Sequence, residues 1–199
     1  MAKQKNNKQL ELIQTLLNDA YLQKNDDAKF LQEKENVKSK ILEEDKDKSK
    51  AKIMMQREIK THEGLEYLLY KFDEGKKELF PFFFSKSGNK RICDYFLFVE
   101  EKELLYVFVI ELKLGATVAA TNQLEAAECF AEFIVKSAQR LNAGFSSNFI
   151  IRKIRICEER GKQAQKRLTK VKPLVEFNEN GIINYDHFKG FMIKYVLDV

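Results

Sequence analysis

The amino-acid sequence predicts an α/β domain in which a mixed sheet is flanked by helices, preceded by an N-terminal helical appendage. Two apolar runs at residues 92–99 and 104–114, rich in Phe, Val, Tyr and Ile, have the composition of β-strands. A segment with helical periodicity follows at residues 119–141, and another strand-like run covers residues 148–157. An order of helices, antiparallel strands, helix and strand is typical of a layered α/β core.

The composition indicates an ordinary globular protein. The chain has 199 residues, of which 44% are hydrophobic, and this is enough for one domain with an appendage. No apolar run approaches the roughly 18–20 residues that cross a bilayer, and the polar start lacks the apolar part of a secretory signal. Three widely spaced cysteines without a Cys-x-x-Cys motif predict small buried thiols in a reducing compartment. We therefore expect a cytoplasmic protein without a membrane partner.

The N-terminal elements are expected to be helical. Residues 8–24 place Leu10, Ile13 and Leu17 on one helical face, and residues 25–27 indicate a break with a new N-cap.

The next segment is charged and has few apolar positions. Residues 28–52 fit a long solvated helix, a helical hairpin or a coiled-coil arm, because their apolar stripe is too narrow for a core helix. Helix is expected to resume over residues 53–72. These patterns divide the chain into a helical arm at residues 1–56 and an α/β domain at residues 57–199.

The remaining elements are short. Residues 100–103 are a charged turn that joins the two apolar runs into a hairpin. Residues 175–177 and 182–184 predict closing strands around a turn at 178–181, and residues 191–196 predict another strand.

Positive charge is concentrated in one stretch. Residues 131–172 contain 11 Lys and Arg against 3 Asp and Glu, a net charge of +8, whereas residues 61–130 are net acidic. A basic block opposite an acidic segment is typical of a polyanion-binding protein with a metal site, although a solubilising basic loop has the same composition. The candidate nucleic-acid-binding residues of this block are Arg152, Lys153, Arg155, Arg160, Lys162, Lys166 and Arg167.

One acid-x-Lys tripeptide differs from the other copies in the chain by its context. Glu111 and Lys113 follow the apolar residues 104–110, on a strand that is predicted to be buried on both faces. Placing a carboxylate and an ammonium there costs free energy unless each is paired.

Hairpin geometry adds a second carboxylate. If the turn is centred between Lys102 and Glu103, Asp94 lies opposite Glu111, with Cβ atoms about 4.5–5.5 Å apart, and Lys113 projects from the same face. A register shifted by one residue would place Asp94 on the opposite face. Adjacent carboxylates repel one another, and a divalent cation such as Mg²⁺ removes that penalty. The alternative is an ordinary hairpin with an ion pair at its end.

These residues resemble the active-site motif of the PD-(D/E)XK nuclease superfamily, whose fold is restriction-endonuclease-like. Asp94, sixteen intervening residues and then Glu111-x-Lys113 carry the resemblance, which covers residues 58–157. The chain departs from the motif at Cys93, where the family often has proline. The resemblance implies that Asp94 and Glu111 bind Mg²⁺ or Mn²⁺ and that Lys113 is the catalytic lysine.

The resemblance also implies two further positions. Many members carry a Glu on the helix before the hairpin, for which Glu66 is preferred over Glu63, and the alternative is a solvated helix residue. Gln123 lies where some members have a Gln that contacts the site or the nucleic acid, and the alternative is an ordinary residue at a helix start.

The expected function is a metal-dependent nuclease that hydrolyses phosphodiester bonds, in DNA, through two carboxylates and a lysine. By analogy we expect a homodimer or a protein partner bound through the N-terminal helices. One alternative is a non-catalytic module that binds nucleic acid or protein on a nuclease-like fold. Another is a coiled-coil protein in which residues 28–52 are the functional part.

Overall fold

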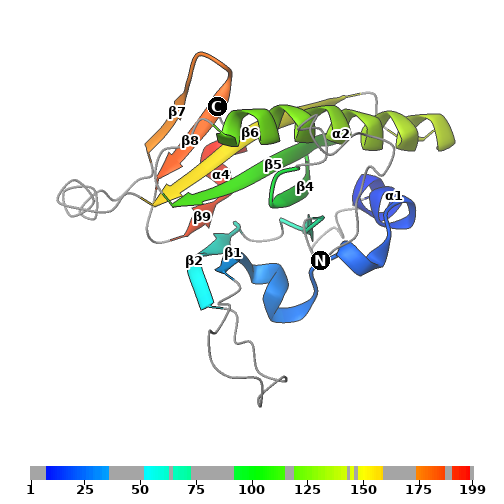
Figure 1. Ribbon diagram of the computed structural model, residues 1–199. Helices are drawn as coiled ribbons and strands as arrows, with labels where there is room; N and C mark the ends of the chain where they lie inside the picture. Colours follow the sequence, from blue (N-terminus) through cyan, green and yellow to red (C-terminus); the bar gives the residue numbers. More distant parts are fainter. Residues whose placement is uncertain are drawn as a thin grey trace, which may run out of the picture.

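The computed structural model forms two β-sheets with helices on the larger one (Figure 1). It describes residues 8–35, 52–62, 65–72, 92–114, 119–142, 144–145, 148–158, 174–186 and 190–197.

The larger sheet has six strands in the order β3-β4-β5-β6-β8-β7. Strands β3, β4 and β5 are antiparallel neighbours, β5, β6 and β8 are parallel, and β7 pairs with β8 in the antiparallel sense. Helix α2 (Ala119–Leu141) connects β5 to its parallel neighbour β6. The α/β class with a mixed sheet is thereby confirmed. The strand bounds are β3 Tyr67–Tyr70, β4 Tyr95–Glu101, β5 Leu104–Leu114, β6 Phe149–Glu158, β7 Leu174–Phe177 and β8 Ile182–Asp186.

The β4–β5 hairpin has the predicted register. Leu97 pairs with Phe108 and Tyr95 with Ile110, which centres the turn between Lys102 and Glu103. Both turn residues have positive φ, 52° and 66°, as a two-residue type I′ turn requires. The register therefore places Asp94 and Glu111 on the same face of the sheet, as the predicted turn requires.

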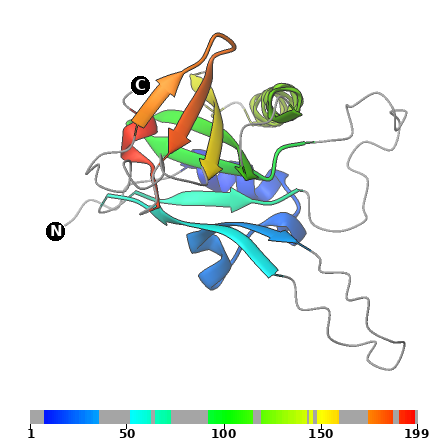
Figure 2. The same ribbon diagram turned by 60° about the vertical axis from the view of Figure 1, so that its left-hand side comes forward.

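The two faces of the large sheet are covered by different parts of the chain (Figure 1 and Figure 2). Helices α1 (Lys8–Leu16) and α2 pack on one face, which we call the helical face. Strands β1 (Phe30–Glu35), β2 (Lys52–Lys60) and β9 (Phe191–Met192) form the second sheet, and together with helix α4 (Lys194–Leu197) they pack on the other face.

Aromatic rings fill much of the core under α2. Phe72 packs edge-on against Phe96 and Phe130, with ring centroids 5.1 and 5.4 Å apart. Tyr70 stacks on Phe72 and meets Phe98 edge-on, both at 5.8 Å. These contacts join β3 and the residues just after it to β4 and α2.

Of the expected helical arm, only α1 is helical among the described residues, and the helices expected over residues 28–52 and 53–72 are wrong there. Residues 30–35 and 52–60 are strands β1 and β2, and residues 67–70 are strand β3. The pattern in β2 has period two, since Met55 and Ile59 are buried while Gln56 and Glu58 are exposed. The intervening residues 36–51 lie outside the described residues.

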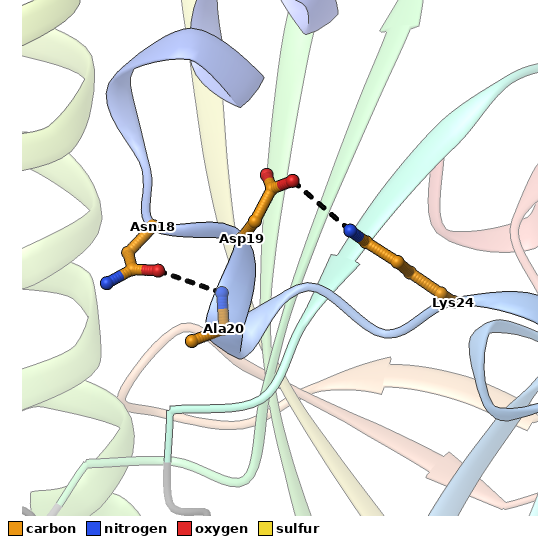
Figure 3. A network of polar contacts seen from close by, with 4 residues as sticks. All are labelled: Asn18, Asp19, Ala20 and Lys24. Carbon is orange, nitrogen blue, oxygen red and sulfur yellow. Dashed lines mark hydrogen bonds and ion pairs between the residues drawn. The ribbon is translucent and has the colours of Figure 1, made fainter.

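Helix α1 is shorter than the predicted helix over residues 8–24. It ends at Leu16, and the Asn18 side chain then accepts a hydrogen bond from the Ala20 amide (2.9 Å), which starts a short 3₁₀ turn (Figure 3). Asp19 of this turn forms an ion pair with Lys24, three residues beyond the turn, at 3.1 Å. A second 3₁₀ turn, η2 (Asn25–Lys29), then leads into β1 in place of the predicted helix start.

The two predicted strands around the turn at residues 178–181 are confirmed, whereas the strand predicted over residues 191–196 is only partly formed. Strands β7 and β8 enclose a turn in which Asn178 Oδ1 accepts hydrogen bonds from the amides of Asn180 and Ile182. Residues 191–196 divide into the short strand β9 and the start of α4. Within the described residues, no helix combines the length and hydrophobicity that a membrane span needs.

Candidate functional site

Asp94, Glu111 and Lys113 lie together on the helical face, where β4 begins and β5 approaches its end. Val109 belongs to the hydrophobic cluster under α2, and because side chains alternate along a strand, Glu111 and Lys113 project from the same face. Asp94 immediately precedes β4, two residues before Phe96, which is also in that cluster. The hairpin therefore brings together the three residues that the sequence predicts.

The two carboxylates are positioned by reciprocal hydrogen bonds. The Asp94 backbone amide donates to Glu111 Oε2 at 3.2 Å, and the Leu112 amide donates to Asp94 Oδ2 at 2.7 Å. Each side chain is thus held by the backbone beside the other carboxylate. This arrangement orients both groups before any ligand binds.

Glu111 is the charged group most affected by its surroundings. Its side chain is 0% exposed, and burial, followed by the neighbouring charge of Asp94, raises the pKa of Glu111 to about 8. Lys113 forms an ion pair with Glu111 Oε1 and acts in the opposite direction. Glu111 thus lies between a neighbouring carboxylate, which raises its pKa, and the Lys113 ammonium, which lowers it.

The cysteines only partly agree with the expectation of buried thiols. Cys93 is fully buried beside the carboxylate pair, and burial together with Glu111 and Asp94 raises the pKa of its thiol well above the usual value. Cys129 is exposed on α2, because it lies on the side of that helix away from the sheet.

A polar row continues across the sheet from Glu111. Arg155 of β6 is the register partner of Glu111, and Asn184 of β8 is the register partner of Arg155. Arg155 Nε and Nη2 donate to Asn184 Oδ1 at 2.9 and 2.5 Å. We call Asp94, Glu111, Arg155 and Asn184 the cross-sheet row.

Asn184 is the member of this row that sequence reasoning missed. Its position was inside a predicted strand, but no local motif marks it. Only the parallel pairing of β6 with β8 places it beside Arg155, and parallel partners are distant in sequence.

Strand alternation separates the described residues of the basic block. Arg152 projects from the face opposite the row, and its guanidinium lies 5.7 Å from the centre of the Phe177 ring. Lys153 lies on the helical face, in an ion pair with Glu128 of α2 at 2.8 Å. Arg155 is the block residue that adjoins Glu111. The other four predicted binding residues lie outside the described residues: Arg160, Lys162, Lys166 and Arg167.

Glu66 does not join this site. It is exposed, and it precedes β3 rather than lying on a helix. The next residue, Tyr67, pairs with Val99, so five further residues of β4, about 17 Å at 3.4 Å per residue, separate that level from Asp94. The helix expected to carry Glu66 is strand β3 and the segment before it, and Glu63 lies outside the described residues.

Gln123 is half-buried on α2, near the start of the helix that follows the hairpin. Its contact with the site or with the nucleic acid stays a prediction.

The carboxylate pair fits a hard divalent cation. Mg²⁺ is usually held by one or two carboxylates together with waters and substrate phosphates, and Asp94 and Glu111 supply two carboxylates, one immediately before β4 and the other on the neighbouring strand β5. Across the part of the chain that the structure describes, no group of three or more His, Cys, Asp and Glu side chains gathers to hold a metal ion.

Comparisons with family models, with curated proteins and with solved structures find nothing that matches this chain.

Proposed function

We propose that this chain is a metal-dependent nuclease of the PD-(D/E)XK type, with a restriction-endonuclease-like fold and DNA as its substrate. The observation that supports the proposal most is the orientation of the two carboxylates by backbone amides, Glu111 by that of Asp94 and Asp94 by that of Leu112. Lys113 lies against the fully buried Glu111. The antiparallel β4–β5 hairpin, followed by α2 and the parallel strand β6, also supports the proposal, because the resemblance rests on a hairpin followed by a crossover helix and a further strand.

In this proposal Asp94 and Glu111 hold Mg²⁺ or Mn²⁺. A divalent cation there supplies Lewis-acid chemistry that polarises a phosphodiester and favours deprotonation of the attacking water. The two side chains contribute position and charge, because their hydrogen bonds to the backbone fix them before substrate arrives.

Lys113 acts on the substrate side of the pair. Hydrolysis forms a P–O bond from water and breaks an ester P–O bond, so negative charge grows on the phosphoryl and leaving oxygens. The ammonium of Lys113, held at Glu111, stabilises that charge in a site that is largely shielded from water. It also holds a proton at Nζ next to the reacting atoms.

A cleavage assay tests the proposal. Wild type is incubated with supercoiled, linear and single-stranded DNA and with RNA, in Mg²⁺, Mn²⁺ or EDTA. We expect metal-dependent cutting of DNA that falls by at least about a hundredfold in Asp94→Asn and Glu111→Gln, because even the groups that orient metal ligands contribute about 10–100-fold.

Glu100→Gln is the matched control. Glu100 is a buried carboxylate of the same hairpin, at the end away from Asp94, where it accepts a hydrogen bond from the Gln9 amide at 3.0 Å. This variant should cut as wild type does. Absence of cutting by wild type in every metal, without a metal-induced rise in melting temperature, would leave a non-catalytic binding module as the better description.

A further inference from the structure

Arg155 differs from Lys113 and Lys153, which also lie on the helical face, in the partner of its charged group. Lys113 pairs with Glu111, and Lys153 pairs with Glu128. Among the described residues, Arg155 forms no ion pair with a carboxylate, and its hydrogen-bond partner is the neutral amide of Asn184. The guanidinium thus keeps its positive charge while its position is fixed.

The place of this charge follows from the register. Arg155 is the direct partner of Glu111 on the adjacent strand, and neighbouring strands are about 4.8 Å apart. Because Arg155 reaches toward Asn184 on the next strand, its guanidinium lies roughly one to two strand spacings, about 5–10 Å, from the carboxylate pair. It is half-buried.

We propose that Arg155, positioned by Asn184, is the phosphate-binding residue that sets the path of a nucleic-acid strand across the cross-sheet row. This inference rests on the proposed function, since it assigns the backbone phosphate next to the scissile one to Arg155. A planar guanidinium matches two phosphate oxygens, and it loses little freedom on binding when another group already orients it. Two of its N–H groups are engaged by Asn184, which leaves three of its five donors for the phosphate.

The structure also argues against an equal contribution to phosphate binding from Arg152 and Lys153, the two other basic residues described on β6. Arg152 belongs to the opposite face, and the charge of Lys153 is compensated by Glu128. The proposed path of the nucleic-acid strand therefore leads from Asp94 and Glu111 over Arg155 toward β8.

Binding in EDTA isolates this contribution from catalysis. The affinity of a fluorescent DNA oligonucleotide is measured at several salt concentrations for wild type, Arg155→Gln and Arg155→Lys. We expect Arg155→Gln to weaken binding about 10–100-fold, as for a charge-assisted hydrogen bond, and to lower the salt slope by about 1. Arg155→Lys should keep the salt slope and lose affinity, because an ammonium cannot contact Asn184 and the phosphate in the same geometry.

Asn184→Ala tests the positioning role. It leaves the charge in place, so the salt slope should stay as in wild type while affinity falls and, in Mg²⁺, KM rises more than kcat falls. Asn184→Asp should weaken binding as much as Arg155→Gln, because the new carboxylate neutralises the guanidinium. The control is Arg140→Gln, which removes one exposed positive charge near the far end of α2; its affinity should change less than twofold.

The outcomes separate the two proposals. Cutting by wild type with equal binding losses in Arg155→Gln, Arg152→Gln and Arg140→Gln would overturn the role of Arg155 and leave the nuclease standing. No cutting by wild type, but a loss of DNA binding specific to Arg155→Gln and Asn184→Asp, would overturn the nuclease and support a phosphate site in a binding module. If wild type does not cut and the loss of binding is not specific to these variants, both the nuclease proposal and the role of Arg155 are overturned.

Discussion

At the scale of single residues, Glu111 shows that a charged residue of the candidate site can be buried in the hydrophobic core. A wholly buried carboxylate beside a second carboxylate is unfavourable to fold around. Its backbone hydrogen bond and Lys113 offset part of that cost, yet its pKa remains at about 8. A residue whose environment opposes its charge is a functional candidate on physical grounds.

We predict that the stability of the metal-free protein falls as pH rises from about 5 to 8. The pKa of Glu111 is about 8 in the folded chain against an ordinary value of 4.5. Between these values the folded state holds a proton that the unfolded state has lost, so this contribution is complete below pH 4.5 and is lost as pH rises through 8. For one proton the slope is about 1.4 kcal/mol per pH unit.

Urea unfolding in EDTA at a series of pH values measures this slope. Glu111→Gln carries no titrating group at this position and should flatten the profile, and it should be the more stable protein at pH 8. The same slope in wild type and Glu111→Gln would show that other groups cause the pH dependence.

At the scale of elements, the β4–β5 hairpin determines whether a site exists at all. A one-residue slip would move Asp94 to the other face, away from Glu111. Such a slip would exchange the buried residues of the two faces of β4, since Phe96 and Phe98 pack in the cluster under α2 whereas Leu97 packs in the cluster on the other face. The turn supports the same register, although Lys102 and Glu103 are not residues that favour positive φ.

We therefore predict that Glu103→Gly stabilises the protein by roughly 0.5–1 kcal/mol, since glycine relieves the cost of positive φ. The φ of Glu103 is 66°, and its carbonyl accepts a hydrogen bond from Gln9 that glycine preserves. Glu103→Ala is the control and should give no gain, because alanine has the same steric cost as Glu. Thermal unfolding of the two variants distinguishes relief of backbone strain from removal of a side chain, which would affect both alike.

The elements that could be predicted from sequence are those with strong local patterns. The hairpin, helix α2 and strands β6 to β8 have dense apolar runs or clear helical periodicity, so Asp94, Glu111 and Lys113 could be placed together without a structure. Strands β1 and β2 could not, because their few apolar residues are compatible with both periods. Tertiary contacts favour strand over helix in these segments. The Tyr95 hydroxyl, for example, accepts a hydrogen bond from the Gln32 amide and donates one to the Gln32 carbonyl.

At the scale of the whole molecule, residues near the N-terminus contribute to the packing of both faces of the large sheet. Leu10 and Ile13 belong to the cluster on the helical face, whereas Leu31 and Met55 belong to the cluster on the other face. The boundary that the sequence suggests between residues 56 and 57 falls inside β2. The hairpin that carries Asp94 and Glu111 is thus enclosed by segments from before and after that boundary.

We predict that the chain unfolds as one unit and that residues 57–199 alone do not fold cooperatively. Burial of four side chains such as Leu10, Ile13, Leu31 and Met55 contributes about 6–12 kcal/mol at roughly 1.5–3 kcal/mol each. That is comparable with the whole stability of a typical domain, about 5–15 kcal/mol. In urea, circular dichroism and tyrosine fluorescence of the full chain should give coincident transitions, whereas the truncated chain should give none. A sharp transition in residues 57–199 would instead establish residues 1–56 as a separable arm, and would return the N-terminal segment to the role of a partner-binding appendage.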